Sequence, residues 1–141
     1  MKIQAVHPRP DEADQMPYAP AVEVREGFGL LFIAGATASP LYHQHPHVAE
    51  EHVLPHDIKE QTRMALENIK QVLDARSLTW ANVVKITKYV TDMRDMDGMY
   101  EVLSEHFGSW RPAGTLVAVN NLSAPGARIE LDMIAALPSA L

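Results

Sequence analysis

The last apolar segment of the chain alternates strictly with charged side chains. Between Arg128 and Ala136 the apolar residues fall on one side of an extended chain: Ile129, Leu131, Met133 and Ala135. The charged residues fall on the other side: Arg128, Glu130 and Asp132. Because side chains of a strand point to alternate faces, the pattern predicts a sheet with one buried face. That face requires helices to cover it, and the other face is left for water or for copies of the chain.

Two amphipathic segments are predicted to supply the covering helices. The first runs from about residue 57 to residue 76 and begins with the capping-box pair Asp57 and Glu60. The second follows Asp95, a residue type typical of N-caps, and ends at Gly108. Its apolar stripe is predicted to pack in the core: Met96, Met99, Leu103 and Phe107.

The other strands are predicted from alternation, β-branched residues and turn signals. A short edge strand at Lys2–Val6 comes first. Ala21–Arg25 and Leu30–Ile33 then flank a turn, which predicts a hairpin whose second strand is buried on both faces. Two further strands precede the last one: Asn82–Val90 and Thr115–Val119. We expect one α+β domain over residues 1–141, with two helices on one face of a mostly antiparallel or mixed sheet.

Composition excludes several classes of function. The 141 residues contain no cysteine, which rules out a disulfide scaffold, a cysteine-based zinc site and a cysteine nucleophile. Asp and Glu outnumber Lys and Arg by 18 to 12, and no basic run offers a patch for a phosphate backbone, so nucleic acid is not an expected partner. No apolar stretch approaches the roughly 20 residues that cross a bilayer, and the N-terminus lacks the apolar region of a signal peptide. We expect a cytoplasmic protein with no membrane partner.

Five of the seven histidines fall in residues 36–56, a proline-rich segment without helical or strand periodicity. They are His43, His45, His47, His52 and His56. His43, His45 and His47 could place alternate imidazoles on one side of an extended chain and chelate Zn²⁺ or Ni²⁺. A single imidazole could instead act as an acid or base in a nearby cleft. The third interpretation, a solvated polar loop, is the one we favour, so neither a metal nor a cofactor is predicted.

Several short motifs occur in an order and spacing that resemble one known family. They are Pro17–Val22, Leu31–Gly35, Gln61, Asn68-Ile69, Asn82–Thr87, Thr91–Asp95, Phe107, Arg111–Ala113 and Gly126–Asp132. The chain resembles the reactive-intermediate deaminases, the Rid or YjgF-type proteins also called L-PSP endoribonucleases. The resemblance implies a chorismate-mutase-like fold and a homotrimer whose sheets form an inner barrel, with ligand clefts between subunits. It also implies hydrolysis of reactive imines and enamines, such as 2-aminoacrylate, to a keto acid and ammonia.

The resemblance assigns site residues, with two departures. The family's glutamate on the last strand corresponds to Glu130, expected to handle water, and its N-terminal tyrosine corresponds to Tyr18. Active members carry a carboxylate-binding arginine where this chain has Gly114, and many carry an asparagine where it has Tyr100. Alternatives remain for the retained residues, because Glu130 could pair with Arg128 and Tyr18 could cover the edge of the core. We therefore expect the fold of the family without the arginine that binds the substrate carboxylate in its active members.

Other residues could complete a substrate site. Gly114 and Thr115 offer a backbone N–H and a hydroxyl group. Arg111 could swing its guanidinium into the cleft, or stay solvated at a helix-to-strand turn. Gly35 lies directly before the histidine segment and is predicted to contact substrate.

The leading hypothesis is a homotrimer that binds a small imine, enamine or carbonyl metabolite between subunits. If the protein is an enzyme, hydrolytic deamination is expected, on a substrate other than 2-aminoacrylate. The alternative is a trimer that binds a small molecule without catalysis. A metal-dependent hydrolase that uses the histidine segment is a third hypothesis, and cleavage of RNA is disfavoured by the acidic charge.

Overall fold

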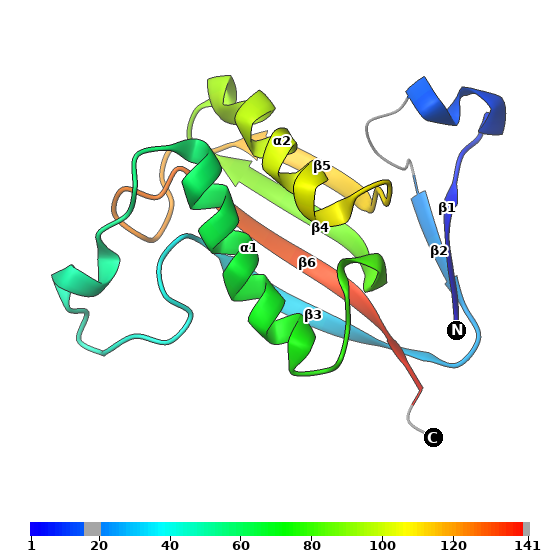
Figure 1. The fold of residues 1–141 in the computed structure, drawn as a ribbon, viewed down its shortest axis with the longest axis horizontal. Coiled ribbons are helices and arrows are strands. Elements are labelled where there is room, and N and C mark those ends of the chain that lie inside the picture. The colour runs from blue at the N-terminus through cyan, green and yellow to red at the C-terminus, as the bar shows by residue number, and fades with distance from the viewer. Residues whose placement is uncertain (16–20, 140–141) are drawn as a thin grey trace.

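The computed structural model describes residues 1–15 and 21–139, and over these ranges helices cover one face of a sheet (Figure 1). The strands are β1 (Lys2–Val6), β2 (Ala21–Arg25), β3 (Phe28–Ala36), β4 (Val83–Val90), β5 (Ala113–Ala118) and β6 (Ile129–Pro138). The helices are α1 (Ile58–Asp74) and α2 (Met96–Phe107), with short 3₁₀ turns at Pro10–Gln15, Ala49–His52, Trp80–Asn82 and Met93–Asp95. The predicted α+β class is confirmed.

The main sheet has the strand order β3-β6-β4-β5. β6 runs antiparallel to β3 and β4, while β4 and β5 are parallel, so the sheet is mixed. The register places Glu130 of β6 opposite Tyr89 of β4, and Ile86 of β4 opposite Gly114 of β5. Residues 130 and 114 therefore lie on strands that are separated by β4.

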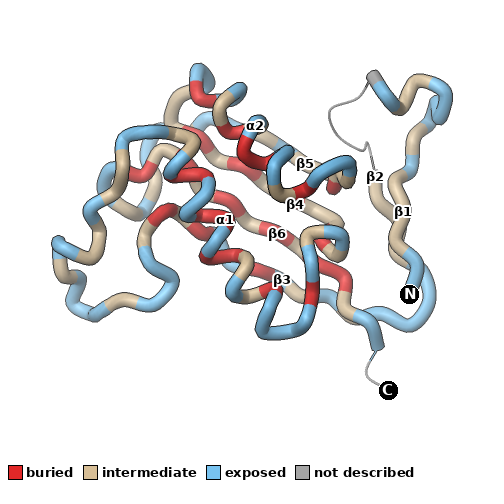
Figure 2. The backbone as a smooth tube through the Cα atoms, in the orientation of Figure 1, coloured by how far each residue is buried: buried red, intermediate tan, exposed pale blue. Residues whose placement is uncertain are grey.

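The core forms between the sheet and the two helices, as the alternation of β6 predicts (Figure 2). The apolar residues of β6 under the helices are at most 1% exposed: Ile129, Leu131, Met133 and Ala135. Asp57 caps α1 by accepting a hydrogen bond from the N–H of Glu60, and Gly108 ends α2 with a φ of 59°. In α2 the predicted stripe is buried except at Met96, which lies in the first turn and stays 37% exposed.

The hairpin predicted between β2 and β3 is wrong. β2 pairs with β1 in a separate two-stranded ladder, and β3 pairs with β6 (Figure 1). Glu26 and Gly27 both have positive φ, as a tight turn requires, but here the turn leads the chain from one sheet to the other. A turn signal shows where the chain bends and does not identify the strands that pair.

The expectation that the strand at Leu30–Ile33 is buried on both faces is also wrong for this chain. Exposure alternates along β3, and Ile33 lies in the core. Phe28, Leu30 and Phe32 lie on the face that the helices do not cover, where Phe32 is 72% exposed. An apolar run has the same sequence whether the chain itself or another molecule covers its second face.

Two buried amides of α1 attach the loops to the helix. Gln61 is fully buried and donates from Nε2 to the carbonyl oxygens of Pro55 and Gly126, at 2.7 and 2.9 Å. Its Oε1 accepts from the N–H of Arg128 at 2.8 Å. Two turns further along the helix, Asn68 donates to the carbonyl oxygens of Thr37 and Ser39, at the start of the histidine segment (residues 36–56).

The described helices are all too short or too polar to cross a bilayer.

Replacing Gln61 with leucine should lower the free energy of unfolding by about 2–4 kcal/mol, because two carbonyls and one N–H lose their partner in a buried site. Glu67→Leu on the exposed side of the same helix is the matched control and should change stability by less than about 0.5 kcal/mol. Urea unfolding followed by circular dichroism measures both. Equal effects of the two substitutions would contradict the anchoring role of Gln61.

Candidate ligand site

A cavity of about 430 Å³ lies where β3 leads into the histidine segment. Gly35 of β3 and Glu130 of β6 line it, and so does Asn68 of α1. Three imidazoles of the segment also reach it: His43, His47 and His52. The structure thus brings two of the predicted site residues and the histidine segment to one place.

Glu130 lies directly over Gly35. A β-carbon at position 35 would be 2.1 Å from Oε1 of Glu130, so only glycine leaves room for this carboxylate position. The pairing of β3 with β6 is irregular between Ile33 and Ala36, which is typical of strands that re-aim a side chain near a site. Among the described residues, no ion pair includes Glu130. Its oxygens are therefore available to accept protons from a ligand or from water.

The alternative pairing of Glu130 with Arg128 is wrong. Arg128 donates to Oδ1 of Asp95 at 2.5 Å and to the carbonyl oxygen of His56. Asp95 stands at the start of α2 as predicted, but its buried carboxylate makes no capping bond because it faces Arg128. The pair joins the start of α2 to the start of β6.

A buried lysine occupies the space beside Gly114 on β5. A β-carbon at position 114 would be 2.8 Å from Nζ of Lys88, so the ammonium stands where a side chain at 114 would begin. Lys88 is 4% exposed and its Nζ lies 5.2 Å from the ring centroid of Tyr100. Burial, with a smaller contribution from the charge of Lys85, lowers the pKa of Lys88 to about 8. The sequence analysis does not single out Lys88, although a lysine that interrupts the apolar face of the strand at Asn82–Val90 is a visible signal.

The remaining predicted residues lie apart from the cavity or outside the described chain. Thr115 accepts a hydrogen bond from Nζ of Lys85 at 3.1 Å on the helix-free face. Arg111 donates from Nη1 to the carbonyl oxygens of Gly108 and Trp110, so its guanidinium here closes the turn after α2. Tyr18 lies outside the described residues. Within one chain the candidates form two groups, one around Glu130 and the other around Gly114.

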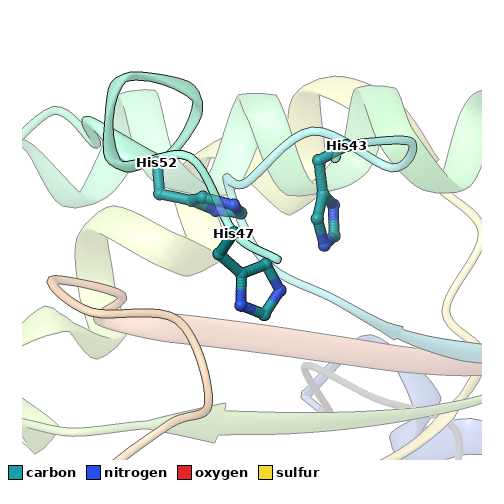
Figure 3. A group of neighbouring side chains, drawn as sticks. All are labelled: His43, His47 and His52. Atoms are coloured by element: carbon teal, nitrogen blue, oxygen red, sulfur yellow. The ribbon is translucent and has the colours of Figure 1, made fainter. Parts of the chain in front are cut away.

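The histidine segment folds back on itself instead of running extended. The ring centroids of His43, His45 and His47 are 4.7–5.0 Å apart, and that of His52 is 4.8 Å from that of His43. Figure 3 shows His43, His47 and His52 of this group. The 3₁₀ turn at Ala49–His52 brings His52 into this group. Spacing along the chain could not predict the participation of His52, because it depends on how the loop closes.

The fold and site define a class of small α+β protein with a sheet open on one face and a carboxylate-lined cavity at the sheet's end. The sequence profile of the Endoribonuclease L-PSP family matches residues 10–137. A RutC family protein of Pyrococcus horikoshii is 39% identical over 119 residues, which cover 84% of this chain and 86% of that protein. The chain belongs to this family, which includes the YjgF, RutC and Rid proteins.

Other relatives extend the comparison. Protein mmf2 of Schizosaccharomyces pombe, named as mitochondrial, is 34% identical over 122 residues, covering 85% of this chain and 87% of that protein. TdcF of Escherichia coli, named as a proposed reactive intermediate deaminase, is 29% identical over 85 residues, covering 58% and 65%. A Rid family protein of Yersinia pestis, described as of unknown function, has a similar structure with a TM-score of 0.76 and 25% identity, covering 97% of this chain and all of that one.

Replacing Lys88 with methionine should stabilise the protein at pH 7. The lowered pKa means that the folded state holds the charged ammonium at a cost, and wild-type stability rises with pH from about 8 toward the ordinary lysine value of 10.5 as that charge is lost. The Tm difference between K88M and wild type should therefore be positive at pH 7 and shrink across this window. Thermal unfolding at several pH values measures it, with Lys70→Met on the exposed face of α1 as control. A pH-independent difference would contradict the buried charge.

Proposed function

We propose that the protein is a homotrimer that hydrolyses a small imine or enamine to a carbonyl compound and ammonia in clefts between its subunits. The observation that carries the proposal is the carboxylate of Glu130, which lies over Gly35 in the cavity without an ion-pair partner among the described residues. The name of the relative TdcF as a proposed reactive intermediate deaminase supports this reaction class. We propose a cytoplasmic location on the sequence grounds given above.

The helix-free face of the sheet supports self-association. Phe28, Leu30 and Phe32 of β3 form an exposed apolar strip, and Val117 is an exposed apolar residue on β5 at the opposite edge of the sheet. Apolar patches of this kind on small proteins mark contact surfaces. A ring of three copies would join unlike surfaces of neighbouring subunits. It would therefore bring the β5 edge of one subunit toward the Glu130 cavity of the next.

The proposed reaction adds water across the C=N bond of the substrate. Glu130 takes a proton from the attacking water while the oxygen bonds to the imine carbon, and it passes this proton to the nitrogen as the π bond of the C=N group breaks. In the resulting carbinolamine the hydroxyl proton moves through Glu130 to the nitrogen while the C–N bond breaks, which leaves a C=O group and releases ammonia. An enamine first becomes the imine by gaining a proton on carbon and losing one from nitrogen. A positioned carboxylate is the group that this sequence of proton transfers needs.

Lys88 is proposed to supply the positive charge that the family places at position 114. Its ammonium occupies the space next to Gly114, although it reaches there from β4. An ammonium is a point charge and cannot form the bidentate fork of a guanidinium. We therefore expect weaker discrimination in favour of small carboxylates such as 2-iminopropionate, and a preference for larger substrates that gain contacts elsewhere in the cleft.

Replacing Glu130 with glutamine should reduce ammonia release from the preferred substrate by about 10²–10⁴-fold, the usual contribution of a positioned acid or base. Gly35→Ala should also reduce it strongly, because the new methyl group displaces the carboxylate of Glu130. The assay measures ammonia from freshly generated 2-iminopropionate and from larger aminomuconate-type enamines.

Gly29→Ala is the matched control on the same strand, since a β-carbon there meets Leu137 at an ordinary distance of 3.8 Å. Full activity of Glu130→Gln would refute the role of the carboxylate, and rapid turnover of 2-iminopropionate would refute the specificity. Saturable binding of keto acids or amino acids in a thermal-shift screen, with no turnover of any imine, would favour the alternative of a non-catalytic binding trimer.

Replacing Phe32 with aspartate should convert the proposed trimer to a monomer, because it places a charge on the most exposed residue of the apolar strip on β3. Val53→Asp is a matched control, because Val53 is similarly exposed at 79% but lies outside the sheet. Light scattering after size exclusion measures the mass. A wild-type monomer would refute any site between subunits.

A further inference from the structure

We propose that His43, His47 and His52 form a binding site for a divalent transition-metal ion at the cavity that holds Glu130. The three side chains come from different parts of the histidine segment and point toward a common space (Figure 3). One nitrogen from each lies within 4.8 Å of the others. The site shares its cavity with Glu130, but metal binding can be tested without the imine chemistry proposed above.

The distances are close to what a metal ion requires. Bonds of about 2.0–2.1 Å from Zn²⁺ to imidazole nitrogens, at tetrahedral angles, separate the nitrogens by roughly 3.3 Å. The present spacing needs a contraction of about 1.5 Å at most, by side-chain rotation. His47 is exposed on the loop and can rotate freely, while His43 and His52 are partly buried and held by neighbours.

Hydrogen bonds orient two of the imidazoles for metal binding. Nδ1 of His43 lies 3.0 Å from the carbonyl oxygen of Pro40, which can only accept, so Nδ1 donates and the neutral imidazole would have its lone pair on Nε2. Nδ1 of His52 lies 3.1 Å from Oγ of Ser39, which can accept in the same way. Metal-ligating histidines commonly use their second nitrogen in this manner.

His52 supplies the strongest single indication. Its Nε2 is buried and has no hydrogen-bond partner among the described residues. A buried polar atom without a partner carries a cost in free energy, and a nitrogen lone pair that faces two other imidazoles is satisfied by a metal ion. A solvated polar loop, the interpretation that we favour from the sequence, would leave this atom in water.

The loop that carries the three ligands is held in place on both sides. Asn68 donates to the carbonyl oxygens of Thr37 and Ser39, at 3.0 and 2.7 Å. The backbone N–H of Gln44 donates to Oε2 of Glu51 at 2.9 Å. These bonds keep His43 and His52 facing each other before any ion is present. Preorganisation of this kind reduces the entropy that binding must overcome.

The donor set selects the class of ion. Three imidazoles with no thiolate suit Zn²⁺, Ni²⁺ or Cu²⁺, and exclude Mg²⁺ and Ca²⁺, which prefer oxygen ligands. A three-histidine site leaves one position open for water or a ligand. His45, whose ring centroid is 4.7 Å from that of His43, is close enough to compete for that position. Glu130 lines the same cavity, so a ligand bound to the ion would face its carboxylate.

Titration of tag-free protein with ZnCl₂ in a calorimeter tests the site. We expect one ion per chain, with affinity at least about tenfold lower in His52→Gln and His47→Ala. His56→Gln and His7→Gln are the matched controls, because these histidines lie outside the cluster, and they should bind as wild type. Binding of Co²⁺ should give the strong visible absorption of a four-coordinate ion.

Thermal unfolding separates loss of the site from loss of the fold. All variants should unfold near the wild-type Tm without metal, and Zn²⁺ should raise the Tm of wild type and of the controls but not of His47→Ala. Because His47 is exposed, its replacement keeps the test valid if His52→Gln fails to fold. Absence of saturable binding, or equal binding by His47→Ala and His56→Gln, would overturn the proposal.

Discussion

The cavity depends on two side-chain amides that project from α1 into its surroundings. Apolar packing holds α1 against the sheet, but such contacts have no direction and do not position loops. Gln61 and Asn68 position the loops, because the buried amide of each donates hydrogen bonds to two loop carbonyl oxygens. Asn68 sets the start of the histidine segment, and Gln61 sets its end together with the start of β6. The helix therefore determines where Glu130 and the imidazoles lie relative to each other.

The parts of the fold that follow short-range rules could be predicted from the sequence. The cap at Asp57, the stop at Gly108 and the alternation of β6 each depend on neighbours within one turn or one strand. The sequence predicts roles for Glu130 and Gly35 separately. It does not predict their contact, because that contact depends on the pairing of β3 with β6. The family resemblance implies the residue types of the proposed site, and the structure gives the distances between those that it describes.

The features that could not be predicted depend on partners far along the chain. β2 pairs with β1 and not with the strand after its turn, which no local signal specifies. Phe32 is apolar in a run that predicts burial, and its exposure reflects the missing second layer on the helix-free face. His52 joins His43 only because Asn68 and a loop carboxylate fold the segment back on itself.

Lys88 and Gly114 show how a side chain on one strand can occupy the space that a residue without a side chain leaves on the next strand. A guanidinium at position 114, as the family resemblance implies, would have to begin in the space that the Lys88 ammonium now occupies. A side chain at position 114 would therefore require the Lys88 ammonium to move, and in this chain Lys88 places one positive charge at this point of the sheet. That charge lies beside β5, whereas Glu130 is on β6 across β4, and Lys88 does not line the cavity of Glu130. Closure of the sheet by a neighbouring copy, at the apolar strip of β3, is the arrangement that would unite the two halves of the site.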